Sequence, residues 1–320
     1  MLPRLRIIGA LVMGFVLSPP VPTASFAGDG VVQNQISVYT GSNAQGYLQP
    51  LANAFGAALN SSFGYSAFIP KTSFHLSLEA PVMGVIFEDG ERTFTAQAES
   101  GFQPNPGEDG TASVPTVVGD GEAVNISGQG GATFAFPGGL GLNSFGLAVP
   151  QLRVSSLAGT EAVVRWIAFE AGDADIGDVS LFGVGGRHSI SQYMGESPLF
   201  DLAVTAMWQS LKVGENDRGG DFCSTEALAL QLQASKRAPV GFLTFEPYAA
   251  VAWEKLDVDL DYDDANGEPV NVSMEGENDV RFTLGAGFNF VAGQLWADYS
   301  FANTNNFSFG LALGNLGRAQ

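Results

Sequence analysis

The chain has 320 residues, enough for one large domain or two of ordinary size, and only 15% of them are charged. Its 33 acidic residues outnumber its 14 lysines and arginines, and the formal net charge of −19 argues against a nucleic-acid partner, which requires a basic face. Because Cys223 is the only cysteine, an intramolecular disulfide and a cysteine metal cluster are both excluded.

Residues 1–27 have the pattern of a secretory signal peptide. Two arginines precede the apolar run 7–17, and Ala27 is a small residue that suits cleavage before Gly28. A retained anchor helix is the alternative, which the short apolar run and the prolines after it disfavour. No later stretch approaches eighteen unbroken apolar residues, so the sequence predicts no transmembrane helix.

Residues 28–61 are predicted to form an N-terminal arm and a short amphipathic helix. The arm is rich in glycine, asparagine and glutamine, and an apolar stripe at helical spacing follows over Tyr47–Leu59. This helix is too short to span a bilayer. It is interpreted as a plug inside a barrel or a helix on its periplasmic rim, with a surface helix on a soluble sheet as the alternative.

Residues 62–320 show apolar side chains at every second position, which is typical of strands. The hairpin 241–291 is the clearest example, since each arm carries an apolar face of about ten residues, the length that a tilted strand needs to cross a bilayer. Soluble sandwiches alternate in the same way, but aromatic residues at the edge of the apolar face favour a membrane barrel. The other predicted strands include 74–82, 93–98, 160–169, 179–187, 200–209, 228–233, 295–301 and 307–313.

The connections between these strands alternate in length, with short ones at 157–159, 235–239 and 291–293 and longer acidic ones between them. Short periplasmic turns and long external loops are typical of outer-membrane barrels. The predicted fold is therefore all-β, a closed antiparallel transmembrane β-barrel of about 12 strands (10–14) with a short N-terminal helix. Its expected place is the bacterial outer membrane, where lipid is a partner.

Two irregular stretches interrupt the strand pattern. Residues 100–131 lack periodicity and are predicted to be an extracellular loop or an inward-folded constriction. Prolines and glycines then break the apolar stretch 132–154, which indicates either a bulge or a lateral gap in the barrel wall, because proline cannot donate to a strand ladder. The lateral-gap candidates are Pro137, Gly138, Gly139, Gly141, Gly146 and Pro150.

Few residues have a catalytic pattern, and no catalytic, cofactor or metal site is predicted. His75 and Ser77 share a strand face, but this spacing is too common to indicate an enzyme. The acidic run 257–264 lacks the EF-hand pattern and is interpreted as a solvated hairpin tip. The predicted lumen-facing residues are His75, Glu79, Arg165, Glu246, Arg281 and Asn289.

Three stretches carry a resemblance to a known family: the helix 47–59 leading into 63–67, residues 145–165, and the pair 296–301 and 307–311. With these, the chain resembles the FadL-like outer-membrane barrels, which include PorV-type members. The resemblance implies passive uptake of hydrophobic small molecules such as long-chain fatty acids. PorV-type members imply the alternative, a structural barrel that partners secretion machinery. A polar porin fits less well, because the predicted lumen has sparse charges.

Overall fold

The structure is a computed structural model that describes residue 32 and residues 35–72, 74–99, 101–169, 178–195, 198–215, 219–290 and 293–314. The predicted signal peptide lies outside the described residues. Within them, no helix has both the length and the apolar character that crossing a membrane requires.

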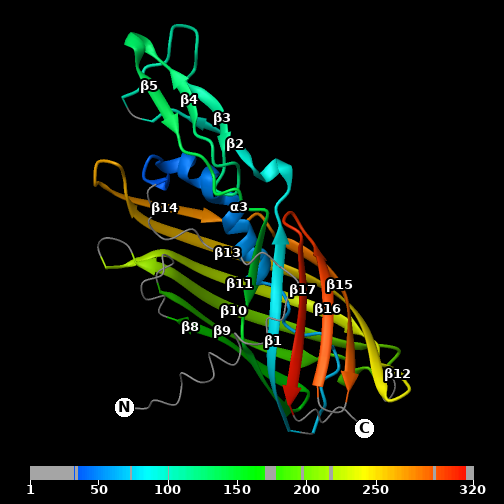
Figure 1. Cartoon of the computed structure of the whole chain (residues 1–320). Helices are drawn as coiled ribbons and strands as arrows, with labels where there is room; N and C mark the ends of the chain where they lie inside the picture. Colours follow the sequence, from blue (N-terminus) through cyan, green and yellow to red (C-terminus); the bar gives the residue numbers. More distant parts are fainter. Residues whose placement is uncertain are drawn as a thin grey trace.

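The described residues form a closed antiparallel barrel of ten strands (Figure 1). β11 pairs with β13, and β1 pairs with β17, so that the ten strands close into a ring. Ten strands is the lower end of the predicted range. In chain order they are β1 (His75–Ile86), β7 (Gln151–Leu157), β8 (Thr160–Phe169), β9 (Val179–Ser189), β10 (Asp201–Glu215), β11 (Asp221–Ser235), β13 (Leu243–Asp263), β15 (Val280–Phe290), β16 (Gly293–Phe301) and β17 (Asn306–Gly314).

The outer face of the barrel is an apolar belt. On β11, Leu228, Leu230 and Leu232 point outward and are 38–49% exposed, while their neighbours Ala229 and Gln233 are buried inside. Leucine, valine and aromatic side chains continue this exposed surface around the ring. A continuous apolar surface of this extent is unfavourable in water, and it matches the lipid-facing band of an outer-membrane barrel.

Two short strands extend the wall at opposite ends. β12 (Ala238–Val240) pairs with the start of β13, and β14 (Pro269–Glu275) pairs with its far end, at 257–263. The two barrel ends are named here the β12 end and the β14 end. Because β13 has 21 residues, it reaches well beyond the part that pairs with β15.

β6 (Ser144–Ala148) and β7 form one interrupted strand. Val82 pairs with Ala148 and Glu79 pairs with Gln151, so the register against β1 is the same on both sides of the break. Val149 keeps a backbone hydrogen bond of 3.1 Å to Pro81. The break therefore leaves the pairing with β1 unshifted.

A small folded unit projects beyond the β14 end of the barrel (Figure 1). It contains the pairs β2 (Thr93–Gln97) with β3 (Thr111–Pro115) and β4 (Val124–Ser127) with β5 (Thr133–Phe136). Two 3-10 turns belong to it, η1 (Asp89–Glu91) and η2 (Gln129–Gly131), whereas η3 (Ser191–Tyr193) lies between β9 and β10. Of the two expectations for residues 100–131, the inward-folded constriction is wrong, because the apolar residues of this stretch pack with Phe94 and Phe136. The extracellular loop stays a prediction.

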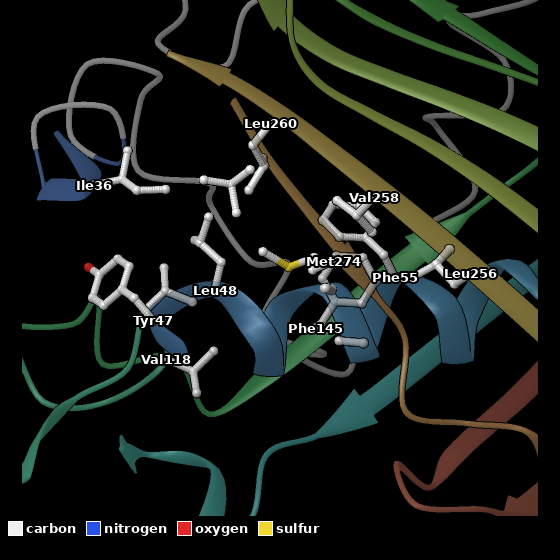
Figure 2. Packing of buried hydrophobic residues seen from close by; sticks show 14 of the residues in the cluster. Ile36, Tyr47, Leu48, Phe55, Val118, Phe145, Leu256, Val258, Leu260 and Met274 are labelled. Carbon is white, nitrogen blue, oxygen red and sulfur yellow. The ribbon is translucent and has the colours of Figure 1, made fainter. Parts of the chain in front are cut away.

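Helix α3 (Gly41–Leu59) begins six residues before the predicted helix and packs against β14, β2, β1, β13 and β6. Its polar first turns are held by tertiary contacts, since Asn43 Nδ2 donates to the Gln97 carbonyl (2.7 Å) and Gln45 Nε2 to the Ser273 carbonyl (2.8 Å). Figure 2 shows its apolar face, including Leu48 and Phe55, against Phe145 and residues of β13 and β14. The helix thus fills the interior at the β14 end.

Candidate functional site

The chain continues from α3 through the barrel interior as an irregular segment, residues 60–69. Phe63, Tyr65, Ser66, Ala67 and Ile69 of this segment are all at most 3% exposed. Buried backbone carbonyls outside regular structure need partners from elsewhere. In this protein the inner wall of the barrel supplies them, and α3 together with residues 60–69 is named the plug.

Arg165 on β8 holds the end of the helix. Its guanidinium donates to the carbonyls of Leu59 (2.9 Å), Ser61 (2.7 Å) and Ser62 (2.8 Å). It also donates to the Oε1 atoms of Gln151 (2.7 Å) and Gln209 (3.2 Å). A cation at a helix C-terminus is favoured by the helix dipole and fills the acceptors that the last turn leaves open.

Ser62 needs this support because its φ of 57° lies in the left-handed region. For a residue with a side chain, that conformation costs roughly 1–2 kcal/mol. Trp296 Nε1 donates to Ser62 Oγ at 3.1 Å, and the Trp296 ring stacks on Tyr65 with centroids 4.9 Å apart. β8 and β16, on different sides of the barrel, thus hold the same turn of the plug.

A buried ion network holds the middle of the plug. Glu161 Oε2 accepts from Arg153 Nη1 (3.2 Å) and Arg187 Nη1 (2.7 Å), and Glu79 Oε2 accepts from Arg153 Nη2 (2.9 Å). The two arginines also donate to the plug, Arg153 to the Phe63 carbonyl (3.0 Å) and Arg187 to that of Ser66. The charges are paired and hydrogen-bonded, as burial requires.

Gly64 lies directly against this network. A Cβ at position 64 would be 2.7 Å from Arg187 Cζ, closer than real Cβ contacts allow. Gln233 Nε2 donates to the Gly64 carbonyl at 2.8 Å. The backbone approaches the guanidinium closely here, so a side chain at position 64 would have to displace Arg187 from its contacts.

Glu246 on β13 binds the end of the plug nearer the β12 end. Its Oε1 accepts from Ser66 Oγ (2.6 Å) and Ser235 Oγ (2.7 Å), and its Oε2 from Asn289 Nδ2 (3.1 Å). Arg281 is paired instead with Glu254, at 2.9 Å, and both side chains are buried. Glu246 therefore binds the plug, whereas the pair of Arg281 and Glu254 bonds within the wall itself.

The structure places all six predicted lumen-facing residues on the inner face, and five of them join the contacts that hold the plug, Asn289 through its hydrogen bond to Glu246. Glu79, Arg165 and Glu246 do so as described, and His75 Nε2 lies 3.4 Å from Glu161 Oε1. Ser77 Oγ donates to Glu79 Oε1 at 3.0 Å, so its hydrogen is not directed at His75. This geometry is not that of a nucleophile and its base.

Sequence reasoning missed Arg153, Glu161 and Arg187, which form the centre of the buried network. A signal was present, because Glu161 has the same parity as Arg165 on β8, and Arg153 and Arg187 lie on the strands beside it. Following the alternation of each strand through its charged residues would have placed all three inside.

Four of the six lateral-gap candidates are wrong, because they do not lie in the barrel wall. Pro137, Gly138, Gly139 and Gly141 connect β5 to β6 and pack on residues 116–121, where Gly139 N donates to the Asp120 carbonyl at 2.6 Å. Their glycines serve close backbone packing, since a Cβ at Gly139 would be 2.3 Å from the Thr116 carbonyl oxygen. Gly146 lies in β6, and Pro150 lies between β6 and β7.

The pairing of the wall changes at Pro150. The ladder between β7 and β8 ends with Gln151 opposite Arg165, followed by one hydrogen bond from Trp166 N to the Pro150 carbonyl at 3.3 Å. Beyond that point β6 pairs with β1, and residues 167–169 of β8 pair with β9. Within the described part of the chain, no strand pairing joins β6 to β8, and this stretch is named the seam.

The interior beside the seam is apolar, in contrast to the polar plug contacts nearer the β12 end. Phe145 of β6 packs edge-on against Phe55 of α3, with centroids 4.8 Å apart. Val149, Leu181 and Leu211 belong to the same buried cluster. The lumen thus has an apolar level toward the β14 end and a closed polar level nearer the β12 end.

A cavity of about 370 Å³ lies at the β14 end, between α3, the β1–β2 turn and the loop 303–305. Glu88, Glu91 and Glu277 line it. Burial raises the pKa of Glu91 above its usual value, with the carboxylates of Glu88 and Glu277 contributing. The cavity at this end therefore has an acidic lining.

The apolar belt, the closed ring and the polar plug define a plugged β-barrel of the bacterial outer membrane. The family model that matches residues 24–315 is described as "Family of unknown function (DUF6588)", and the chain belongs to this family. None of the curated proteins matches the sequence.

Solved outer-membrane transporters are similar to the chain at low identity. The Escherichia coli outer membrane transporter YddB is 8% identical (75% of this chain and 41% of YddB, TM-score 0.26), so the chain spans less than half of its length. The Ralstonia pickettii toluene transporter TbuX is 8% identical (78% and 90%, TM-score 0.26). The CymD monoaromatic hydrocarbon channel is 10% identical (81% and 93%, TM-score 0.26). TM-scores at this level carry no information on substrate.

Proposed function

We propose that the protein is a passive uptake channel for hydrophobic compounds, which leave the barrel sideways through the seam into the membrane. The observation that carries this proposal is the position of the seam beside the apolar level of the lumen. In this proposal a solute that enters from the β14 end meets the bonded plug and leaves between β6 and β8, where the described residues have no strand pairing. An apolar solute gains by entering lipid, whereas a sugar or an ion does not.

The acidic entrance favours neutral compounds over anions. Glu88, Glu91 and Glu277 line the cavity at the β14 end, and the whole chain has a formal charge of −19. A carboxylate approaching this surface is repelled, most strongly at low ionic strength. The resemblance to FadL-like barrels implies long-chain fatty acids as substrates, but these electrostatics favour uncharged apolar molecules of similar length.

The test is a cross-link across the seam. Extending the β7–β8 register places Ala148 opposite Ala168, and both are exposed on the outer face. In a Cys223→Ser background, Ala148→Cys with Ala168→Cys, oxidised or joined by a short bismaleimide, should lower uptake of a labelled long-chain alcohol at least tenfold. Reduction of the disulfide should restore it. A labelled long-chain fatty acid should enter more slowly than the alcohol in the wild type.

The matched control is a pair on the intact part of the same ladder, Val154→Cys with Ala162→Cys, which face each other across β7 and β8. This cross-link should leave uptake unchanged. Equal uptake in the cross-linked and free seam variants would contradict the lateral route.

A second candidate function, a non-transporting structural or secretion-partner barrel, is favoured by the extent of the plug contacts. Three arginines donate to the carbonyls of Leu59, Ser61, Ser62, Phe63 and Ser66, which is a firm closure for a channel. A correctly folded wild-type barrel with no uptake of either labelled compound would support this candidate and reject the channel.

A further inference from the structure

A groove crosses the lipid-facing wall on the part of the barrel formed by β8 to β15. Its volume is about 710 Å³, and outward-facing Val204, Leu230, Leu232, Val251 and Trp253 line it. It runs over six neighbouring strands from Thr160 to Val280, a distance of about 24 Å at the usual strand spacing. One leaflet of a bilayer's hydrocarbon core is roughly 15 Å thick, so the groove is long enough for one acyl chain lying obliquely.

Two small outward-facing residues, Gly186 and Ala206, form the floor of the groove. Packing does not require a glycine at position 186, because the nearest atom to an added Cβ is the Glu161 carbonyl oxygen at 3.9 Å. The depression thus results from missing side chains on an otherwise bulky belt. A linear alkyl chain is the shape that fills such a depression.

A polar cluster with basic groups lies where the groove reaches the β12 end. His188 lies at its centre, with Nδ1 2.8 Å from Thr160 Oγ1 and Nε2 3.0 Å from Tyr193 Oη. Gln192 links this histidine to Lys71, because its Nε2 lies 2.9 Å from His188 Nε2 and its carbonyl accepts from Lys71 Nζ at 3.0 Å. An ammonium has three donors, and among the described residues Lys71 uses one of them, so the others can bind a ligand.

We propose that this groove is a binding site for one acidic phospholipid, with an acyl chain over Gly186 and Ala206 and the phosphate at Lys71, next to the polar cluster of His188. The proposal rests on the membrane placement of the barrel and is independent of the transport route. The apolar groove is continuous with the lipid-facing belt, which places its occupant in the bilayer. In a chain of formal charge −19, the ammonium of Lys71, which Gln192 links to His188 at the end of that groove, supplies the charge complementarity for a phosphate.

The experiment measures lipid retention and binding on the purified, folded barrel by native mass spectrometry, with phosphatidylglycerol and phosphatidylcholine as probes. The wild type should retain one phospholipid and bind phosphatidylglycerol more tightly. Lys71→Gln should weaken phosphatidylglycerol binding about fivefold and leave phosphatidylcholine binding unchanged. Ala206→Trp, which fills the floor, should remove both.

Ala297→Trp is the matched control, since Ala297 also faces outward on the belt but lies on β16, away from the groove. It should bind lipid like the wild type, and heat-dependent gel mobility of both tryptophan variants reports that the barrel is folded. Wild-type lipid binding by Ala206→Trp, or equal loss in Ala297→Trp, overturns the proposal. A dimer that Ala206→Trp dissociates assigns the groove to a second copy of the chain and overturns it as well.

Discussion

Arg165 shows how a single buried cation organises the interior. All five of its hydrogen bonds go to neutral oxygens, three of them backbone carbonyls at the end of α3 and the start of the irregular segment. A guanidinium presents five donors in a fixed fork, and here each nitrogen finds an acceptor. Lysine has neither the number nor the geometry of donors to replace it.

We expect Arg165→Leu to loosen the plug without opening the barrel wall. The change leaves several carbonyls without a donor, at about 1–3 kcal/mol for each buried acceptor that water cannot reach. Proteolysis within residues 60–69 and ion conductance in planar bilayers should both rise, and Arg165→Lys should give an intermediate result.

Arg281→Gln is the control for this change, because it removes a buried guanidinium paired with Glu254 on the wall. It should lower the free energy of unfolding without raising conductance. The role given to Arg165 is wrong if the two variants conduct alike.

At the scale of a single strand, neighbouring residues of β15 face lipid and the barrel interior in turn. Leu284 is 47% exposed on the belt, whereas the hydroxyl of Thr283 lies 2.8 Å from that of Ser300 on the inner face. We expect Leu284→Arg to lower the free energy of unfolding by about 2–4 kcal/mol, as a cation at the bilayer midplane does, and Thr283→Arg by less than half of that. Refolding titrations into lipid bilayers measure both values. Equal losses would mean that the facing of β15 is misassigned.

Other elements show how interior contacts override local sequence. α3 extends to Gly41 through a stretch of low helix propensity because Asn43, Gln45 and Gln49 bind carbonyls of β2 and β14. The irregular stretch 132–154 divides for a similar reason. Its first part packs on residues 116–121 outside the barrel, and its second part becomes β6 in unshifted register with β1.

At the scale of the whole molecule, the two ends of the barrel differ in the length of their connections. The turns after β7, β11 and β15 at the β12 end are short, while the long β13–β14 hairpin and the unit of β2 to β5 lie at the β14 end (Figure 1). We therefore expect the β14 end outside the cell. In a Cys223→Ser background, Asn266→Cys should react with an impermeant maleimide on intact cells, because Asn266 is exposed at the hairpin tip.

Phe242→Cys serves as the control for this topology, since Phe242 is 87% exposed in the turn after β12. It should react only after lysis. If Phe242→Cys reacts on intact cells and Asn266→Cys reacts only after lysis, the barrel has the opposite orientation. The proposed entrance would then face the periplasm, and the lipid site would lie in the other leaflet.

The alternation of leucine, phenylalanine and tryptophan with polar residues was sufficient to predict a barrel, its lipid face and the inward position of Arg165, Glu246 and Arg281. That information is local, because period two fixes which side chains share a face. The plug, the ion network of Arg153, Glu161 and Arg187, and the seam were decided only by the tertiary structure. Arg165 and Arg187 reach carbonyls of the plug across more than a hundred residues, the ion network joins residues of three different strands, and the seam is a ladder that stops, so no short sequence pattern encodes these pairings.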